Sequence, residues 1–173
     1  MKWFGGSLLL CLLFVTNTSF FGSSYSKTAY YVVVDKSDYE LKVYDGEGWL
    51  ITYPVVFGND DLGDKLVQGD RKTPEGTFTI ISKKIHNKWS RYLGIDYPIK
   101  ESIELFNRRK QSGQIPAQAK IGGDIGIHGT WPREGFAVDQ YQNWTMGCIS
   151  MKNEHVVQFY NMVPIGTRIT IRK

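Results

Sequence analysis

The chain of 173 residues is 42% hydrophobic and 14% aromatic, which predicts one domain with a sizeable hydrophobic core. Its 21 basic and 17 acidic residues give a formal net charge of +4, a mild excess that suits an anionic polymer but specifies none. The sequence has no block of Lys and Arg, no repeated basic-aromatic pattern and no nucleic-acid motif, so nucleic acid is not expected as a partner.

The N-terminal segment has the layout of a secretory signal. Lys2 is its only charge, residues 8–15 are apolar, and residues 16–26 are largely small or polar. The apolar run is too short to span a bilayer comfortably. We therefore expect residues 1–26 to be a signal peptide, residues 27–173 to be the mature domain, and the protein to be exported to the periplasm or cell envelope.

An uncleaved N-terminal anchor is the alternative to a cleaved signal. Phe20 and Phe21 extend the apolar character of the segment, and such an anchor would associate the protein with the membrane. Lipidation of Cys11 is not expected, because Leu10 stands before it where a small residue is needed. Several serines can flank a cleavage site in this region, so the cleavage position stays open.

Six segments have the alternation or the β-branched and aromatic content of strands. They are residues 29–35, 39–44, 49–57, 77–82, 121–128 and 167–172. The polar cluster Lys36-Ser37-Asp38 predicts a hairpin between the first two. Pro54 cannot donate a ladder hydrogen bond, so the third segment is expected at a sheet edge or a bulge.

Two helices are predicted, one over residues 101–110 and one from Asn153, acting as N-cap, to about residue 162. Residues 83–97 show no clear period, and no element is predicted there. The whole pattern favours a mainly β fold, a single antiparallel β-rich domain of sandwich or barrel-like form with about two helices.

Cys148 is the only cysteine left once residues 1–26 are removed, and an unpaired thiol in an exported protein indicates a use. His128 precedes it by 20 residues, and an imidazole beside a thiol lowers the thiol pKa and later protonates a leaving amine. The N–H groups of Gly147 and Cys148 would face a developing oxyanion. The spacing does not establish that thiol and imidazole meet, and a buried structural cysteine is the alternative.

Metal binding is not expected. His86 and His155 fit no zinc-binding spacing with Cys148, and each is explained as a surface or helix residue. No cofactor is indicated by the sequence either.

Four motifs in order carry a resemblance to a known family. They are Thr73-Pro74-Glu75-Gly76-Thr77-Phe78, Leu93-Gly94-Ile95-Asp96-Tyr97-Pro98, His128-Gly129 and Thr145-Met146-Gly147-Cys148-Ile149. Over roughly residues 29 to 172 the chain resembles the L,D-transpeptidase catalytic (YkuD-like) family of bacterial envelope enzymes. The resemblance implies a β-rich fold and a cysteine acyl-transfer mechanism.

The resemblance also implies roles for single residues. Cys148 would be the nucleophile, His128 its base, and the backbone carbonyl of Gly129 the group that fixes the imidazole orientation. Thr145 would support the cysteine loop, and Gly147 would allow its tight turn and offer an N–H.

Ser150 departs from the family, in which many members have an arginine two residues after the cysteine. Arg133 is a candidate substitute in substrate binding, with a solvated loop charge as the alternative role. Trp131 and Trp144 flank the expected site and are candidates for lining a groove, with packing as the alternative. The glycosylation pattern at residues 143–145 is discounted, since Thr145 is needed by the cysteine loop.

We expect an exported L,D-transpeptidase that acts on peptidoglycan stem peptides and transfers the acyl group to an amine of a neighbouring stem or of an envelope protein. The alternatives are an L,D-carboxypeptidase or hydrolase of the same bonds, and an inactive wall-binding module. Retention of both His128 and Cys148 speaks against the last of these.

Overall fold

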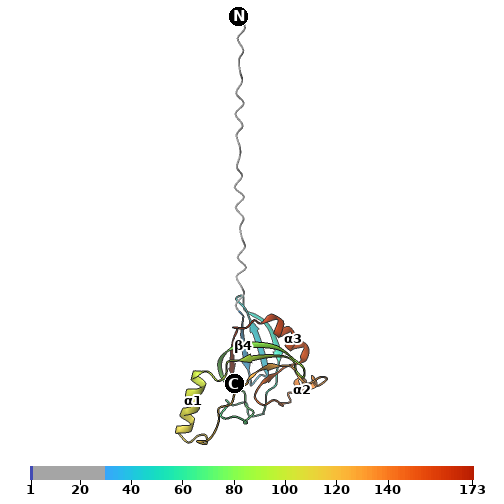
Figure 1. The fold of residues 1–173 in the computed structure, drawn as a ribbon. Helices are drawn as coiled ribbons and strands as arrows, with labels where there is room; N and C mark the ends of the chain where they lie inside the picture. Colours follow the sequence, from blue (N-terminus) through green and yellow to red (C-terminus); the bar gives the residue numbers. More distant parts are fainter. Residues whose placement is uncertain (2–29) are drawn as a thin grey trace.

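The computed structural model describes residue 1 and residues 30–173 (Figure 1). The expected signal peptide or anchor, with Cys11, lies outside the described residues. Within the described part of the chain, no helix is long and apolar enough to cross a membrane.

Eight strands form one sheet in the order β3-β2-β1-β8-β4-β5-β6-β7. Their bounds are Tyr31–Asp35 (β1), Glu40–Tyr44 (β2), Trp49–Pro54 (β3), Gly76–His86 (β4), Ser90–Ile95 (β5), Gly126–His128 (β6), Ile149–Ser150 (β7) and Arg168–Arg172 (β8). Five neighbouring pairs are antiparallel, but β1–β8 and β6–β7 are parallel. The predicted mainly β domain is therefore confirmed, with a mixed sheet in place of a purely antiparallel one.

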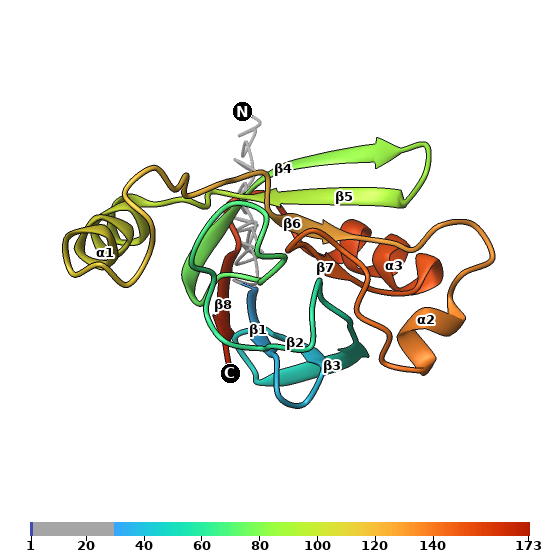
Figure 2. The same cartoon turned by 90° about the horizontal axis from the view of Figure 1, so that it is seen from below.

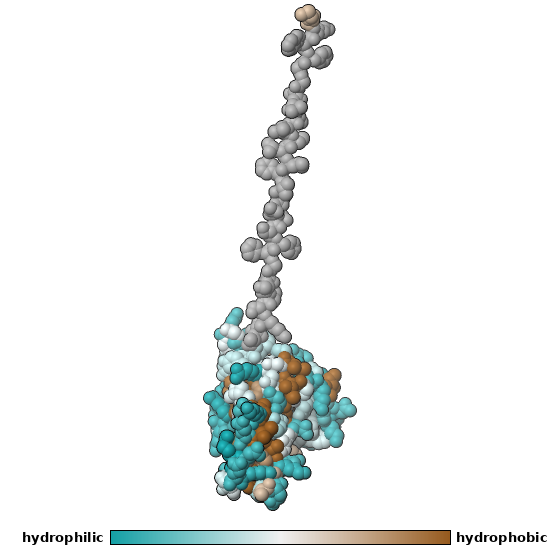
Figure 3. All heavy atoms as spheres, turned by 60° about the vertical axis from the view of Figure 1, so that its left-hand side comes forward, coloured by the Kyte–Doolittle hydropathy of each residue, from teal (hydrophilic) through white to brown (hydrophobic). Residues whose placement is uncertain are grey.

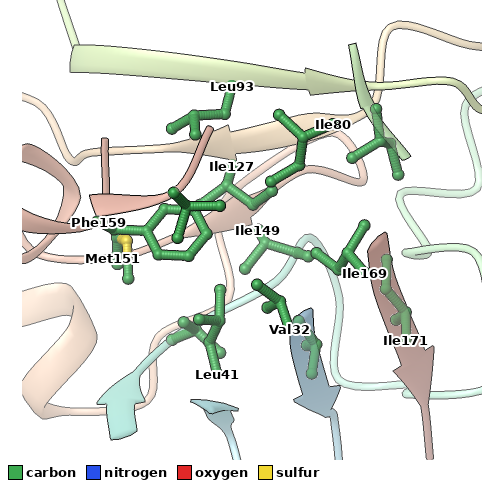
Figure 4. Close-up of a cluster of buried hydrophobic side chains, with 14 of the residues drawn as sticks. Val32, Leu41, Ile80, Leu93, Ile127, Ile149, Met151, Phe159, Ile169 and Ile171 are labelled. Carbon is green, nitrogen blue, oxygen red and sulfur yellow. The ribbon is translucent and has the colours of Figure 1, made fainter. Parts of the chain in front are cut away.

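Alternation along the strands builds the core. In β1, Val32 and Val34 are buried, and their partners in β8 are Ile169 and Ile171. Val34 belongs to one buried cluster with ten residues that Figure 4 labels: Val32, Leu41, Ile80, Leu93, Ile127, Ile149, Met151, Phe159, Ile169 and Ile171. Each fully buried aliphatic side chain of this kind stabilises the fold by about 1.5–3 kcal/mol relative to an exposed one.

The sheet bends around this core until its two ends meet. The first four residues of β4 pair with β8, the rest pair with β5, and a register shift lies between Ile80 and Ser82. Figure 2 shows β4 and β5 on one side of the core and β1, β2, β3 and β8 on the other. Val56, which follows β3, exchanges two backbone hydrogen bonds of 2.8 Å with Ser150 of β7. This bridge gives the bent sheet its barrel-like form.

The hairpin of β4 and β5 is longer than the sequence pattern predicts. The segment expected over residues 77–82 continues to His86, and β5 lies where no element was predicted. The outer part of this hairpin is poorly covered, with Ile81 and Ile85 both exposed. Because this part has no buried face, its sequence shows no alternation of apolar and polar residues. The Nδ1 atom of His86 closes the turn by accepting hydrogen bonds from the N–H groups of Lys88 and Trp89.

Three helices decorate the sheet. Helix α1 (Lys100–Gln111) and helix α3 (Asn153–Met162) confirm the two predicted ones, whereas the four-residue α2 (Phe136–Asp139) was not predicted. Asn153 is not the N-cap as expected; Lys152 occupies that position and makes no side-chain cap. Figure 3 shows the face that carries α1, where hydrophilic residues cover most of the surface and apolar patches lie between them.

Candidate active site

Strands β6 and β7 bring the histidine and the cysteine together. They run parallel, with Ile127 paired to Ile149 and His128 paired to Ser150. The two isoleucines point into the core, so His128 and Ser150 face the other side of the pair. Cys148 precedes Ser150 by two residues and shares that face. Cys148 directly precedes β7, and its thiol lies at the N–H of Gly126, two residues before His128 on β6. This register places the cysteine beside the strand that carries His128, which the spacing of 20 residues alone did not establish.

A backbone carbonyl orients the imidazole. His128 is only 2% exposed, and its Nδ1 lies 2.7 Å from the carbonyl oxygen of Gly129. Because a carbonyl only accepts, the hydrogen is on Nδ1, and Nε2 keeps its lone pair as a base requires. This is the contact that the family resemblance implies for Gly129. Ser150 Oγ donates to the same carbonyl at 3.4 Å.

Position 129 has room for glycine alone. A Cβ atom there would lie 2.1 Å from Asn153 Oδ1 and 2.7 Å from the carbonyl oxygen of Trp89. The Gly129 N–H donates to that same Trp89 carbonyl at 3.0 Å. The close approach of α3 and the β4–β5 turn therefore fixes the backbone that carries His128.

The loop before Cys148 is held by two threonines. Thr145 Oγ1 donates to the Cys148 carbonyl at 2.7 Å and accepts the Gly147 N–H at 3.1 Å. Thr73 Oγ1 donates to the Gly147 carbonyl at 2.9 Å. Gly147 has φ 122°, a value that L side chains rarely adopt. Since the Gly147 N–H is taken by Thr145, the Cys148 N–H is the remaining oxyanion donor of the two considered from the sequence.

The loop of residues 58–75 supports the cysteine loop from outside. Arg71 Nε donates to the Thr145 carbonyl at 3.1 Å. Asp70 organises the loop, because its carboxylate accepts hydrogen bonds from Lys65 Nζ and from the N–H groups of Leu66, Val67 and Lys72. Burial raises the pKa of Asp70, but these donors outweigh it and the net pKa is lowered. The Thr-Pro-x-Gly motif at the end of this loop supports the site through the hydrogen bond from Thr73 to the Gly147 carbonyl.

The Cys148 sulfur lies among backbone groups and one phenol. Its Sγ donates to the Asp124 carbonyl at 3.5 Å, and the Tyr92 hydroxyl donates to the same oxygen at 3.1 Å. Burial raises the pKa of the thiol, the Gly126 N–H lowers it, and the Asp124 charge raises it, with a net increase. Burial, followed by the nearby Cys148, also raises the pKa of Tyr92, so this side chain stays a hydroxyl.

The imidazole and the thiol are both neutral at neutral pH. Burial lowers the pKa of His128 to about 4; the hydrogen bond to Gly129 raises it and the charge of His86 lowers it further. The resting site is therefore an uncharged pair rather than a thiolate–imidazolium pair. The thiol therefore loses its proton only in the step in which the sulfur attacks.

A cleft of about 690 Å³ opens onto the sulfur. Cys148 is half-buried at its wall. The other residues that line it are Ile81, Ser82, Lys84, His86, Trp89, Tyr92, Gly94, Ile95, Asp96, Tyr97, Asp124, Ile125 and Met146. It has the size of a small-ligand site.

The candidate substrate-binding residues fall in different places. Trp144 packs edge-on against the His128 ring with centroids 5.5 Å apart, and Trp131 packs against Trp89 at 6.1 Å. Arg133 is exposed on the loop after β6 and does not line the described cleft. Ser150 is fully buried, so it lies beneath the site and not on its surface.

Two aromatic residues of the site were missed by sequence reasoning. Trp89 stacks on His128 with centroids 4.5 Å apart, and Tyr92 lies near the sulfur. Both lie in the segment without a clear period. The available signal is their place, three residues apart, directly before the family-like Leu93-Gly94-Ile95-Asp96-Tyr97-Pro98 motif. Among residue 1 and residues 30–173, no group of three or more His, Cys, Asp or Glu side chains is arranged to hold a metal ion.

Comparison with known proteins agrees with this architecture. The family model of the L,D-transpeptidase catalytic domain (YkuD) matches residues 29–171. Over 147 residues the chain is 31% identical to the "Putative L,D-transpeptidase YqjB" of Bacillus subtilis, covering 82% of this chain and 70% of that protein.

Solved structures share the fold. The helical cell shape determining protein Pgp2 from Campylobacter jejuni superposes with a TM-score of 0.63 at 23% identity, over 86% of this chain and 49% of that one. An L,D-transpeptidase from Mycobacterium smegmatis gives 0.52 at 19% identity, over 84% and 59%. The chain thus spans about half the length of these solved relatives.

The bent mixed sheet, with His128 on β6 and Cys148 directly before β7, is a β-rich domain whose fold these solved structures share. The family match over residues 29–171 is decisive: the chain belongs to the L,D-transpeptidase catalytic domain family.

Proposed function

We propose that this protein is an exported cysteine acyltransferase of the bacterial envelope. Its substrate is the tetrapeptide stem of peptidoglycan, cut between the L-centre of the third, diamino-acid residue and the terminal D-alanine. The observation that carries the proposal is the pair formed by Cys148 in an open cleft and His128, whose Nδ1 is anchored 2.7 Å from a carbonyl.

The first half-reaction forms a thioester. As the Cys148 sulfur attacks the scissile carbonyl, its proton passes to His128 Nε2, and the Cys148 N–H donates to the oxyanion. Collapse of this intermediate breaks the C–N bond. The imidazolium gives its proton to the departing amine of D-alanine, so His128 returns to its neutral form.

The second half-reaction transfers the acyl group. An amine of a neighbouring stem or an envelope protein attacks the thioester, His128 takes a proton from the amine, and the thiolate leaves and is reprotonated by His128. The new amide bond replaces the thioester without any cofactor. The depressed pKa of His128 suits this cycle, since the base must be neutral when each nucleophile arrives.

Hydrolysis of the same thioester is the second candidate function. Cys148 is half-buried in a cleft open to solvent, so water reaches the carbon that the amine would attack. The product would then be a tripeptide stem, and the protein would act as an L,D-carboxypeptidase.

Incubation of the purified domain with disaccharide tetrapeptide, followed by mass spectrometry, separates these functions. Cross-linked dimer with released D-alanine supports transpeptidation, and tripeptide alone supports the carboxypeptidase. Cys148→Ala should abolish both products. Full turnover by this variant, or no turnover by the unmodified protein with any amine acceptor, would exclude the proposed acyltransferase.

A further inference from the structure

The tip of the β4–β5 hairpin reaches the catalytic histidine. The indole of Trp89 lies 4.5 Å from the His128 ring, centroid to centroid, with an interplanar angle of 22°. Tyr92, the β5 partner of His128, is also nearly parallel to the imidazole at 13°, but its centroid is 6.3 Å away. Trp89 therefore provides the closest aromatic surface against His128 in the described chain.

The main chain of Trp89 fixes the residue beside His128. Its carbonyl accepts the Gly129 N–H at 3.0 Å, while the Gly129 carbonyl receives the imidazole Nδ1–H at 2.7 Å. Gly129 thus links the tryptophan backbone to the histidine ring. One residue of the hairpin contacts His128 in two ways, by its ring and through this peptide group.

Trp89 is itself held from several sides. His86 stacks on it at 4.4 Å with an angle of 8° and accepts its backbone N–H at 3.2 Å. Trp131 and Trp144 pack edge-on against the indole at 6.1 and 6.2 Å. An indole fixed in this way has little freedom to leave the imidazole.

We infer that Trp89 is a positioning residue for His128. Its indole keeps water off one face of the imidazole and holds the ring in the plane in which Nδ1 reaches the Gly129 carbonyl. Nε2 is thereby directed away from this anchor and toward the reacting groups. The inference deepens the acyl-transfer function proposed above, and its catalytic part rests on that function.

The electrostatics of His128 agree with this role. Burial is the main cause of its lowered pKa, and the indole is part of what buries it. The titratable groups around the ring are His86 beyond the indole, Tyr92 on β5 and Cys148, which directly precedes the neighbouring strand β7. Removing the indole hydrates the imidazole without removing any of these groups.

The test is a nuclear magnetic resonance titration of the histidine rings in the intact domain, with His128→Gln used to assign the His128 signal. Trp89→Leu should raise the titration midpoint of His128 by about one pH unit or more, because burial is relieved. Trp89→Phe, which keeps a smaller stacked ring, should give a smaller rise. Trp49→Leu is the matched control, since Trp49 is 61% exposed on β3, and should leave the midpoint unchanged.

An unchanged His128 midpoint in folded Trp89→Leu and Trp89→Phe would overturn the inference. If Trp89→Leu fails to give a cooperative unfolding transition, Trp89→Phe alone decides. With substrate, both variants should lower kcat more than they raise KM. The kcat of Trp89→Leu should be lower than that of Trp89→Phe. The titration needs no turnover, so a protein that cleaves no stem peptide but shows the shift contradicts the proposed function and leaves the positioning role supported.

Discussion

The hydroxyl of Thr73 donates a hydrogen bond of 2.9 Å to the carbonyl oxygen of Gly147, joining the Thr-Pro-x-Gly motif to the cysteine loop across 74 residues of sequence. Both groups are buried, so loss of the donor leaves a carbonyl without its partner. Thr73→Val, which keeps the shape, should cost about 1–3 kcal/mol of unfolding free energy. It should also slow acyl transfer, because the loop that presents Cys148 loses a support.

Urea denaturation and turnover assays measure both effects. Thr77→Val is the matched control, because the Thr77 hydroxyl pairs with Thr170 at 3.0 Å on an exposed face. The control should change stability by about 0.5 kcal/mol or less. Equal behaviour of the two variants would show that the Thr73 contact does not support the site.

Gly129→Ala should disrupt the site more severely than its size suggests. The added methyl group meets Asn153 Oδ1 at 2.1 Å and the Trp89 carbonyl at 2.7 Å, and one of these neighbours is backbone. Overpacking of this kind costs about 1–3 kcal/mol or more. Displacement of the Gly129 peptide also removes the anchor of His128, so turnover should be lost before the fold is.

Gly46→Ala is the control for that experiment. Nothing lies within 4 Å of a Cβ atom at position 46, and its φ is not in the left-handed range. Thermal unfolding and product formation should match the unmodified protein there. If Gly129→Ala has normal stability and activity, α3 and the hairpin can shift to accommodate the methyl group. The close contacts at position 129 then do not fix the backbone beside His128.

His128 should make stability depend on pH between 6.5 and about 4. The folded state holds the imidazole neutral with a pKa lowered to about 4, chiefly by burial, whereas the unfolded chain takes up a proton near pH 6.5. The unfolded state binds more protons in this window, so stability is complete above pH 6.5 and falls as the pH drops toward 4. The loss amounts to about 3 kcal/mol.

Chemical denaturation of the unmodified protein and of His128→Gln at pH 7 and pH 4.5 measures this contribution. Gln carries no titrating proton, so the difference in stability between the two pH values should be smaller in the variant. The lowered pKa of Asp70 acts below this window and is common to both proteins. Parallel pH profiles would refute a buried neutral imidazole.

Ser150 should not tolerate replacement by the arginine that the family resemblance implies at this position. The side chain is fully buried and hydrogen-bonded to the Gly129 carbonyl, so a guanidinium would be buried without a designed partner. Ser150→Arg should destabilise the fold by about 3 kcal/mol or more. Ser150→Ala, which loses one weak hydrogen bond, should cost about 1 kcal/mol or less. Thermal melts that rank these two variants in the opposite order would contradict this account.

The sequence predicted the strands that bury one face and the two longer helices. In β8, Ile169 and Ile171 alternate with polar residues, and alternation is what one-sided burial produces; β1 was recognised instead by its β-branched and aromatic content. The inner part of β4 was predicted over residues 77–82, but its outer part and β5 escaped prediction, since the outer arm of the hairpin is poorly covered. Strand β7 escaped because two residues are too few to show a period.

The candidate site could be predicted in its reactive residues but not in its surroundings. The motifs point to Cys148, His128 and Gly129, and the register of β6 and β7 then supplies the proximity that spacing could not. Trp89 and Tyr92 enter the site through tertiary packing of the hairpin. Their roles depend on how the β4–β5 hairpin packs against His128, and no local sequence pattern predicts this packing.

Strand β8 holds the two parts of the sheet together from its middle. β8 lies between β1 and β4, and it joins the β1–β3 part of the sheet to the β4–β7 part. Without residues 168–172, the only ladder contact left between these two strand groups in the described chain would be the isolated Val56–Ser150 bridge. A change that weakens β8 should therefore loosen the frame of the cysteine site, although no β8 residue lines the cleft at Cys148.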